Sequence, residues 1–139
     1  MTALRLTAIM KTDISGSTPR FRSLTGTDLA ASLAEHRVLI SRLTAEQDGR
    51  IVKGEGDSFW IIFPSVTAAS LAAISMQEEL GRAQSNKGDD RLAMRIVITL
   101  GDVLHEDGDI FGDAVALAAR IESVTPPTRS TCRPLLGLR

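Results

Sequence analysis

Residues 50–63, RIVKGEGDSFWIIF, contain two short apolar runs separated by a glycine-rich segment. The runs at residues 50–53 and 58–63 have the β-branched and aromatic content typical of strands, and we expect Trp60 and Phe63 in the core or at a dimer surface. Between the runs, residues 54–57 (GEGD) provide the glycines and the acidic residue that favour a tight turn. The stretch therefore predicts a β-hairpin, around which the rest of the fold is arranged.

A helix is expected on each side of this hairpin. Before it, leucines and valines recur at helical spacing between Asp28, which can cap the helix start, and about Gln47, where an Asp-Gly pair signals a stop. After it, a Pro-Ser pair breaks the strand, and a second helix is expected over residues 66–83. Residues 84–90 are polar and are expected to be an exposed connection.

A first strand, a fourth strand and a third helix complete the pattern. The apolar residues 4–10 (LRLTAIM) predict a first strand, and the β-branched residues 92–100 (LAMRIVITL) predict a fourth. Residues 101–108 are rich in turn formers and allow only a short strand extension at residues 103–105. Residues 110–124 carry apolar side chains at helical spacing and predict a third helix.

The order β-α-β-β-α-β followed by a helix predicts an α+β sandwich of the ferredoxin-like kind. In that topology the first and third strands are antiparallel neighbours at the centre of the sheet. Asp13 follows the first strand and Asp57 immediately precedes the third. We therefore expect these two carboxylates to lie side by side, although they are far apart in the sequence.

Composition excludes several classes of function. The chain of 139 residues has room for one domain, and its net charge of −1 argues against binding nucleic acid by bulk attraction to phosphate. Cys132 is the single cysteine, which excludes an internal disulfide framework and a cysteine-based zinc site and favours a cytoplasmic setting. No apolar run is long enough to cross a bilayer. With two histidines in the chain, a metal would be held by carboxylates, which favours Mg²⁺, Mn²⁺ or Ca²⁺.

The first segment that could carry chemistry is residues 13–18 (DISGST). A carboxylate at a strand end is followed by small residues, whose exposed amides bind phosphate well near a helix start. An ordinary turn with a helix cap explains the same residues.

The second segment is residues 53–57 (KGEGD), which an ordinary hairpin turn also explains. The predicted topology joins it to the first segment, because it places Asp13 beside Asp57. Two adjacent carboxylates repel each other unless a cation joins them. Two divalent ions, with a triphosphate completing their coordination, would meet that need.

The third segment is residues 107–113 (DGDIFGD) with the helix that follows it. Ala116 and Arg120 are four residues apart and share one helix face. Arg120 is either a rim arginine lying along the helix or a clamp on a phosphate group.

Four strings in this order, KTDISGST, IVKGEGDSFWIIF, RIVITLGDV and GDIFGDAVALAARIE, resemble the catalytic domain of the class III nucleotidyl cyclases, specifically adenylate cyclase. The resemblance extends from residue 4 to about residue 127. It implies conversion of ATP to 3′,5′-cyclic AMP and pyrophosphate, by in-line attack of the 3′-hydroxyl on the α-phosphate with two divalent metal ions, Mg²⁺ or Mn²⁺. It further implies a homodimer with shared active sites and a fused or separate regulatory domain.

The resemblance also implies a role for individual residues. The matching metal ligands are the carboxylates of Asp13 and Asp57 and the backbone carbonyl of Ile14, and Arg120 matches the transition-state arginine. Lys53 matches the residue that hydrogen-bonds adenine N1, and Asp109 matches the one that takes the adenine amino group, a pair that disfavours guanine. The segment around the triphosphate is matched by Ser15, Gly16, Ser17 and Thr18. One subunit would supply Asp13 and Asp57, and the other would supply Lys53, Asp109 and Arg120.

Two departures from the family pattern support an alternative, a cyclase-like nucleotide-binding or regulatory module that is catalytically impaired. Ala116 stands where the family has an asparagine that orients the ribose, and no lysine follows Lys87, although the family places a phosphate-binding lysine near the domain's end. The expected domain is residues 1–127, incomplete at its C-terminus. Residues 128–139 (TRSTCRPLLGLR) show no clear period, and we expect an irregular, non-native tail that arises from truncation or a shifted reading frame.

Overall fold

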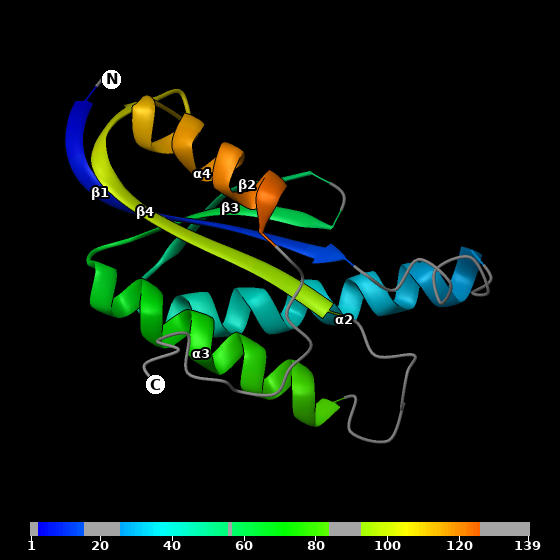
Figure 1. Ribbon diagram of the computed structural model, residues 1–139. Coiled ribbons are helices and arrows are strands. Elements are labelled where there is room, and N and C mark those ends of the chain that lie inside the picture. Colours follow the sequence, from blue (N-terminus) through cyan, green and yellow to red (C-terminus); the bar gives the residue numbers. More distant parts are fainter. Residues whose placement is uncertain (1–2, 16–25, 56, 84–92, 126–139) are drawn as a thin grey trace.

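The computed structural model describes residues 3–15, 26–55, 57–83 and 93–125 (Figure 1). The expected polar connection at residues 84–90 and the expected tail at residues 128–139 lie outside the described residues. Along the chain the described residues form β1 (Ala3–Ser15), α2 (Gly26–Glu46), β2 (Arg50–Glu55), β3 (Ser58–Phe63), α3 (Val66–Ala83), β4 (Ala93–Glu106), β5 (Asp109–Phe111) and α4 (Asp113–Val124).

The strands form one antiparallel sheet in the order β2-β3-β1-β4-β5. Strand β1 lies between β3 and β4, as the ferredoxin-like topology predicts, and the α+β fold class is confirmed. The register pairs Thr12 of β1 with Phe59 of β3. The end of β1 therefore lies beside the start of β3, where Asp57 is found.

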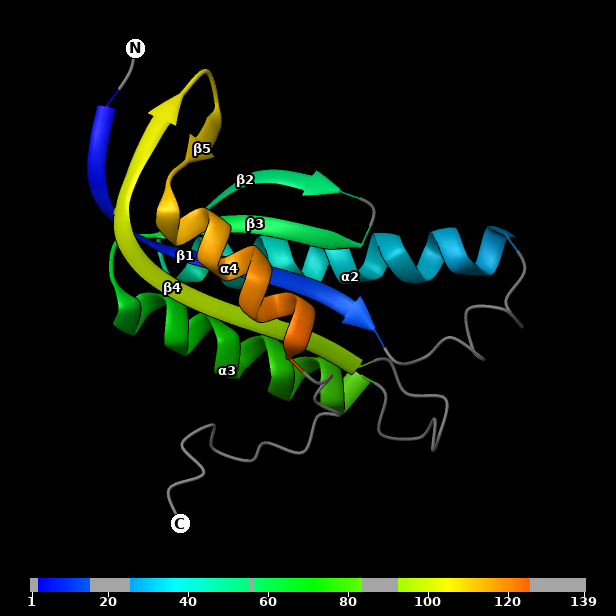
Figure 2. The ribbon, with the colours of Figure 1, turned by 45° about the horizontal axis from the view of Figure 1, so that its top comes forward.

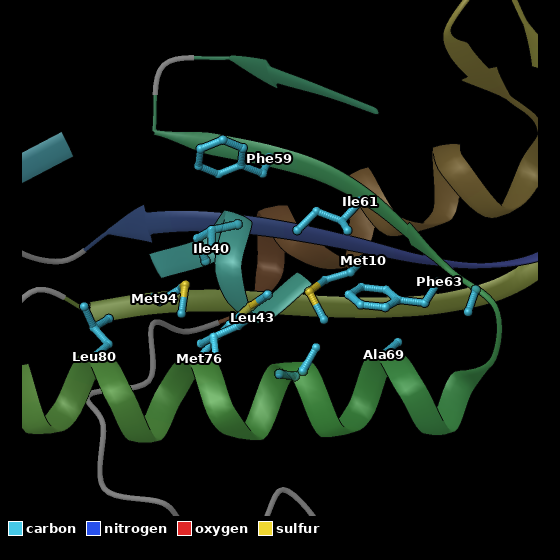
Figure 3. Packing of buried hydrophobic residues seen from close by; sticks show 13 residues of the cluster. Met10, Ile40, Leu43, Phe59, Ile61, Phe63, Ala69, Met76, Leu80 and Met94 are labelled. Carbon is cyan, nitrogen blue, oxygen red and sulfur yellow. The ribbon is translucent and has the colours of Figure 1, made fainter. Parts of the chain in front are cut away.

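Helices cover both faces of this sheet (Figures 1 and 2). Helices α2 and α3 lie on one face, where α3 presents Ala69, Met76 and Leu80 to sheet residues such as Met10 (Figure 3). Helix α4 lies on the other face and packs against a second cluster that contains Trp60. Because both faces are covered, β3 reads as a nearly continuous apolar run, and Trp60 and Phe63 are core residues.

The C-terminal half differs from the prediction in two places. Strand β4 continues to Glu106 instead of giving way to turns after Leu100, because residues 101–105 pair with the first residues of β1. The turn comes at Asp107 and Gly108, which have φ angles of 51° and 78°. Residues 109–111 then form β5, so the helix predicted from Ile110 begins at Asp113 instead.

Two glycines allow α4 to lie close to the sheet. A Cβ at Gly101 would come 2.8 Å from the Cβ of Ala114, so only glycine permits this contact between β4 and the first turn of α4. Gly112 precedes the helix with a φ of 146°, a conformation that side chains rarely adopt. Within the described residues, no helix is both long enough and apolar enough to cross a membrane.

Candidate active site

The structure brings the carboxylates of Asp13 and Asp57 together at one end of the sheet. Asp13 lies near the end of β1, and its Oδ1 accepts a hydrogen bond of 3.3 Å from Oγ of Ser58, the first residue of β3. Burial raises the pKa of Asp57, and the neighbouring charge of Asp13, together with a hydrogen bond between the two carboxyl groups, raises it further. The arrangement therefore concentrates negative charge where two elements distant in sequence meet.

A line of alternating charges extends from Asp13 under the end of α4. Arg95 of β4, the residue paired with Asp13 in the sheet register, donates a hydrogen bond from Nη2 to Oδ2 of Asp13. The same Nη2 lies 3.1 Å from Oε1 of Glu122 on α4, and Nζ of Lys11 lies 3.3 Å from Oε2 of Glu122. Lys11 in turn lies over the ring of Trp60, 5.5 Å from its centroid.

Sequence reasoning did not single out Lys11, Arg95 or Glu122. The alternation of side chains along β1 puts Lys11 and Asp13 on the same sheet face, and helical spacing puts Glu122 on the same side of α4 as the buried Ala118. Those patterns could have indicated that Lys11 and Glu122 meet Asp13 on one covered face.

The donor set at Asp13 and Asp57 fits a divalent cation such as Mg²⁺ or Mn²⁺. Carboxylate oxygens are the ligands that these ions prefer, and a cation would relieve the repulsion that raises the pKa of Asp57. In the part of the chain that the structure describes, no group of three or more Asp, Glu, His or Cys side chains is arranged to hold a metal. Two carboxylates leave coordination positions for other oxygens, and Mg²⁺ typically fills such positions with substrate phosphates and water.

The structure also brings Lys53 and Asp109 together. Nζ of Lys53 on β2 lies 3.2 Å from Oδ1 of Asp109 on β5, and the two side chains are 39% and 35% exposed. Oδ1 of Asp109 accepts a hydrogen bond of 2.8 Å from the backbone N–H of Ile110. That bond, with the hydrogen bond and charge of Lys53, lowers the pKa of Asp109, so its carboxylate is held ionised and oriented.

Arg120 does not join either cluster. It is exposed on α4, as is Ala116 one turn earlier, and among the described residues its guanidinium has no hydrogen bond or ion pair. Of the remaining predicted site residues, Ile14 has a buried side chain within β1. Ser15 ends β1, and Gly16, Ser17 and Thr18 lie outside the described residues.

Comparisons with known proteins identify the family to which this sequence and this fold are similar. The sequence pattern of the adenylate and guanylate cyclase catalytic domain matches residues 3–131. A crystal structure of an adenylate/guanylate cyclase/hydrolase from Silicibacter pomeroyi superposes with a TM-score of 0.82 at 35% identity, covering 91% of this chain and 74% of that one.

Two curated proteins match most of this chain. Putative adenylate cyclase 3 of Rhizobium meliloti is 31% identical over 124 residues, which are 88% of this chain and 21% of that protein. Serine/threonine-protein kinase pkn2 of Myxococcus xanthus is 33% identical over 117 residues, which are 84% of this chain and 14% of that protein. The chain thus spans about a fifth or less of the length of these two relatives.

Proposed function

Because the chain belongs to the family of adenylate and guanylate cyclase catalytic domains, we propose that it is the adenylate type, which converts ATP to 3′,5′-cyclic AMP and pyrophosphate. The observation that carries the proposal is the meeting of Asp13 and Asp57 at one end of the sheet. In this assignment the two carboxylates and the backbone carbonyl of Ile14 hold two divalent ions, Mg²⁺ or Mn²⁺. Those ions, when bound, would lower the pKa of the 3′-hydroxyl and neutralise charge that develops at the α-phosphorus.

The choice of ATP over GTP rests on Lys53 and Asp109. A lysine ammonium donates a hydrogen bond and suits the N1 acceptor of adenine, whereas a carboxylate accepts one and suits the adenine amino group. Guanine has an N–H at N1 and a carbonyl at C6, so it would set donor against donor and acceptor against acceptor. The ion pair of 3.2 Å keeps the two side chains adjacent before a base arrives between them.

We assign Arg120 to the active site of a second copy of the chain. Its exposure, and the absence of an ion-pair partner in the described residues, leave the guanidinium available to a phosphate that the other subunit holds. In a head-to-tail homodimer, one copy supplies Asp13 and Asp57 and the other supplies Lys53, Asp109 and Arg120. Residues 15–18 complete the proposal as the segment around the triphosphate.

The proposal is tested by incubating the purified chain with ATP and Mn²⁺ and measuring cyclic AMP. The expected result is cyclic AMP formation that requires Mn²⁺, rises more than linearly with protein concentration and is abolished in Asp57→Asn. GTP in the same assay should give a much lower rate of cyclic GMP formation. Equal rates with both nucleotides would overturn the adenylate assignment.

Ala116 favours a second candidate, a cyclase-like module that binds nucleotide without turning it over. Alanine cannot donate or accept the side-chain hydrogen bonds that an asparagine makes to a ribose. The same assay distinguishes the two, because this candidate predicts saturable ATP binding in equilibrium dialysis with no cyclic product.

A further inference from the structure

Four charged side chains form a continuous series of ion pairs between the sheet and the C-terminal turn of α4. In order they are Asp13, Arg95, Glu122 and Lys11, and their side chains are 14%, 23%, 13% and 14% exposed. We call these four residues the α4 charge network. Because the network is mostly shielded from water, each charge influences its neighbours more strongly than it would on the surface.

Arg95 holds the carboxylate that the proposed function assigns to a metal. It donates from Nη2 to Oδ2 of Asp13, while Ser58 donates to Oδ1. A divalent ion that approached Asp13 would meet a guanidinium already on one carboxylate oxygen. Arg95 therefore competes with the metal for Asp13, both by occupying Oδ2 and by charge repulsion.

Glu122 provides a second carboxylate for the same guanidinium. Its Oε1 lies 3.1 Å from Nη2 of Arg95, and its Oε2 lies 3.3 Å from Nζ of Lys11. If Asp13 is taken by a cation, Arg95 still has a partner and is not left as an unpaired, mostly buried charge, which would be costly. Lys11 holds Glu122 in place from the other side and lies against Trp60.

We propose that Arg95 acts as an internal counter-ion that stands in for a divalent cation on Asp13, and that Glu122 is a positioning residue that receives Arg95 when the cation binds. The two residues thereby set the affinity of the site for divalent ions. The inference rests on the proposed function, because it takes Asp13 as a metal ligand.

The test is a titration of the full chain with Mn²⁺ alone, with free Mn²⁺ followed by electron paramagnetic resonance. Arg95→Gln removes the competitor and is expected to lower the Kd for Mn²⁺ by about tenfold. Glu122→Gln removes the alternative partner and is expected to raise the Kd by about threefold to tenfold. Glu46→Gln, on the exposed side of α2, loses the same charge far from the network and should leave the Kd unchanged.

The double variant shows whether Glu122 acts through Arg95. In the Arg95→Gln background, Glu122→Gln should change the Kd by less than about twofold, because the residue it positions is absent. The rise in Tm on adding Mn²⁺ gives an independent readout, and it should follow the same order as the Kd values. If Arg95→Gln does not fold, Glu122→Gln decides alone, and unchanged or tighter Mn²⁺ binding overturns the proposal.

The outcomes separate this inference from the proposed function. A purely structural role predicts that both single variants weaken Mn²⁺ binding, and that result overturns the inference. If Glu122 acted on the metal only by through-space electrostatics, the effects of the two substitutions on the Kd for Mn²⁺ would be additive in the double variant. That result overturns the positioning role of Glu122. If the wild type binds no Mn²⁺, or binds it equally well after Asp57→Asn, the metal site itself fails and the proposed function fails with it.

Discussion

Lys53 on β2 and Asp109 on β5 form an ion pair of 3.2 Å, although their strands stand at opposite ends of the sheet order. Figure 2 shows how this arises, since β4 curves strongly and carries β5 round toward β2. The pair proposed to select the base is therefore positioned by the curvature of the sheet rather than by neighbouring residues in one strand. A change in the path of β4 would separate the two side chains without altering either residue.

Selection of the base can be tested by replacing both residues of this pair. Lys53→Glu combined with Asp109→Gly should lower the ratio of the ATP rate to the GTP rate by about tenfold or more, since each mismatched polar contact to the base is costly. Both side chains are more than a third exposed, so loss of the ion pair should cost at most about 1 kcal/mol of stability. An unchanged rate ratio in a variant with native Tm would show that the two residues do not read the purine.

The two acidic residues should respond differently when their charge is removed. Asp57→Asn relieves repulsion and should leave the free energy of unfolding unchanged or raised, whereas Asp13→Asn also removes one of the two carboxylates paired with Arg95 and should lower it by about 1 kcal/mol. Neither variant should bind Mn²⁺ or turn over ATP. Urea denaturation at neutral pH measures the difference, and equal destabilisation by both substitutions would contradict it.

Asp57 also predicts a pH dependence. Its pKa is raised in the folded chain, so as pH rises past the ordinary value of 3.8 the unfolded state loses this proton first. The contribution of Asp57 to stability therefore falls with rising pH up to the raised value, and Asp57→Asn should remove that part of the profile. The comparison requires Tm values of the wild type and the variant at matched pH.

Local sequence patterns predicted the elements that are decided by near neighbours. Helix α3 runs over residues 66–83 as expected, because the helical spacing of its apolar residues and the preceding Pro-Ser pair are both local signals. The extension of β4 over residues 101–106 was predicted only in part, as a short extension at residues 103–105, since its glycine and acidic residue favour a turn in isolation. It is a strand because it pairs with the start of β1, which is a long-range effect that propensity does not contain.

The candidate site likewise contains one feature that the sequence predicted and others that it did not. The meeting of Asp13 and Asp57 follows from strand order alone, so topology was enough to predict it. The contacts of Arg95 with Asp13 and Glu122 depend on how α4 lies across β4, which the order of elements does not specify.

His36 should make the protein sensitive to acid. It is 4% exposed and packs near the ring of Phe59, and burial lowers its pKa from 6.5 to about 4. Below pH 6.5 His36 binds a proton in the unfolded state but stays neutral in the folded state. The free energy of unfolding should therefore fall by about 3 kcal/mol between pH 6.5 and pH 4. Equilibrium urea denaturation across this range should show the loss in the wild type and little of it in His36→Leu.

His105→Gln is the matched control for that experiment. Burial also lowers the pKa of His105, but this ring is only partly buried and bonds Oγ1 of Thr7 at 3.1 Å through Nε2. Most of the acid loss should persist in this variant. If His105→Gln removes it instead, His36 is not the responsible group.

The contact between Gly101 and Ala114 should control the position of α4. Gly101→Ala puts a methyl group 2.8 Å from the Cβ of Ala114 and should cost about 1–3 kcal/mol, because the helix must move outward. Activity should fall with it, since α4 carries both Arg120 and Glu122. Ala114→Gly in the same chain removes the clash and should restore part of the lost activity. If Gly101→Ala acted only by changing the strand propensity of residue 101, Ala114→Gly would restore no activity.

Restoring the asparagine that the family resemblance leads us to expect should raise turnover. Ala116 is exposed one helical turn before Arg120, so Ala116→Asn adds a polar group without disturbing the core. We expect kcat to rise by about tenfold if the amide orients the ribose, with little change in Tm. Ala119→Asn, also exposed on α4, is the control that should leave kcat unaltered.

The central place of β1 has a consequence for synthesis on the ribosome. Among the described strands β1 is made first, yet its neighbours are residues 58–63 and 93–106, so one flank stays open until residues 93–106 have emerged. At ordinary translation speeds that delay is about 5–20 s, far longer than hairpin formation takes. Nascent chains on neighbouring ribosomes could pair through this open flank, and a chaperone that shields extended apolar segments would be of most use during that interval.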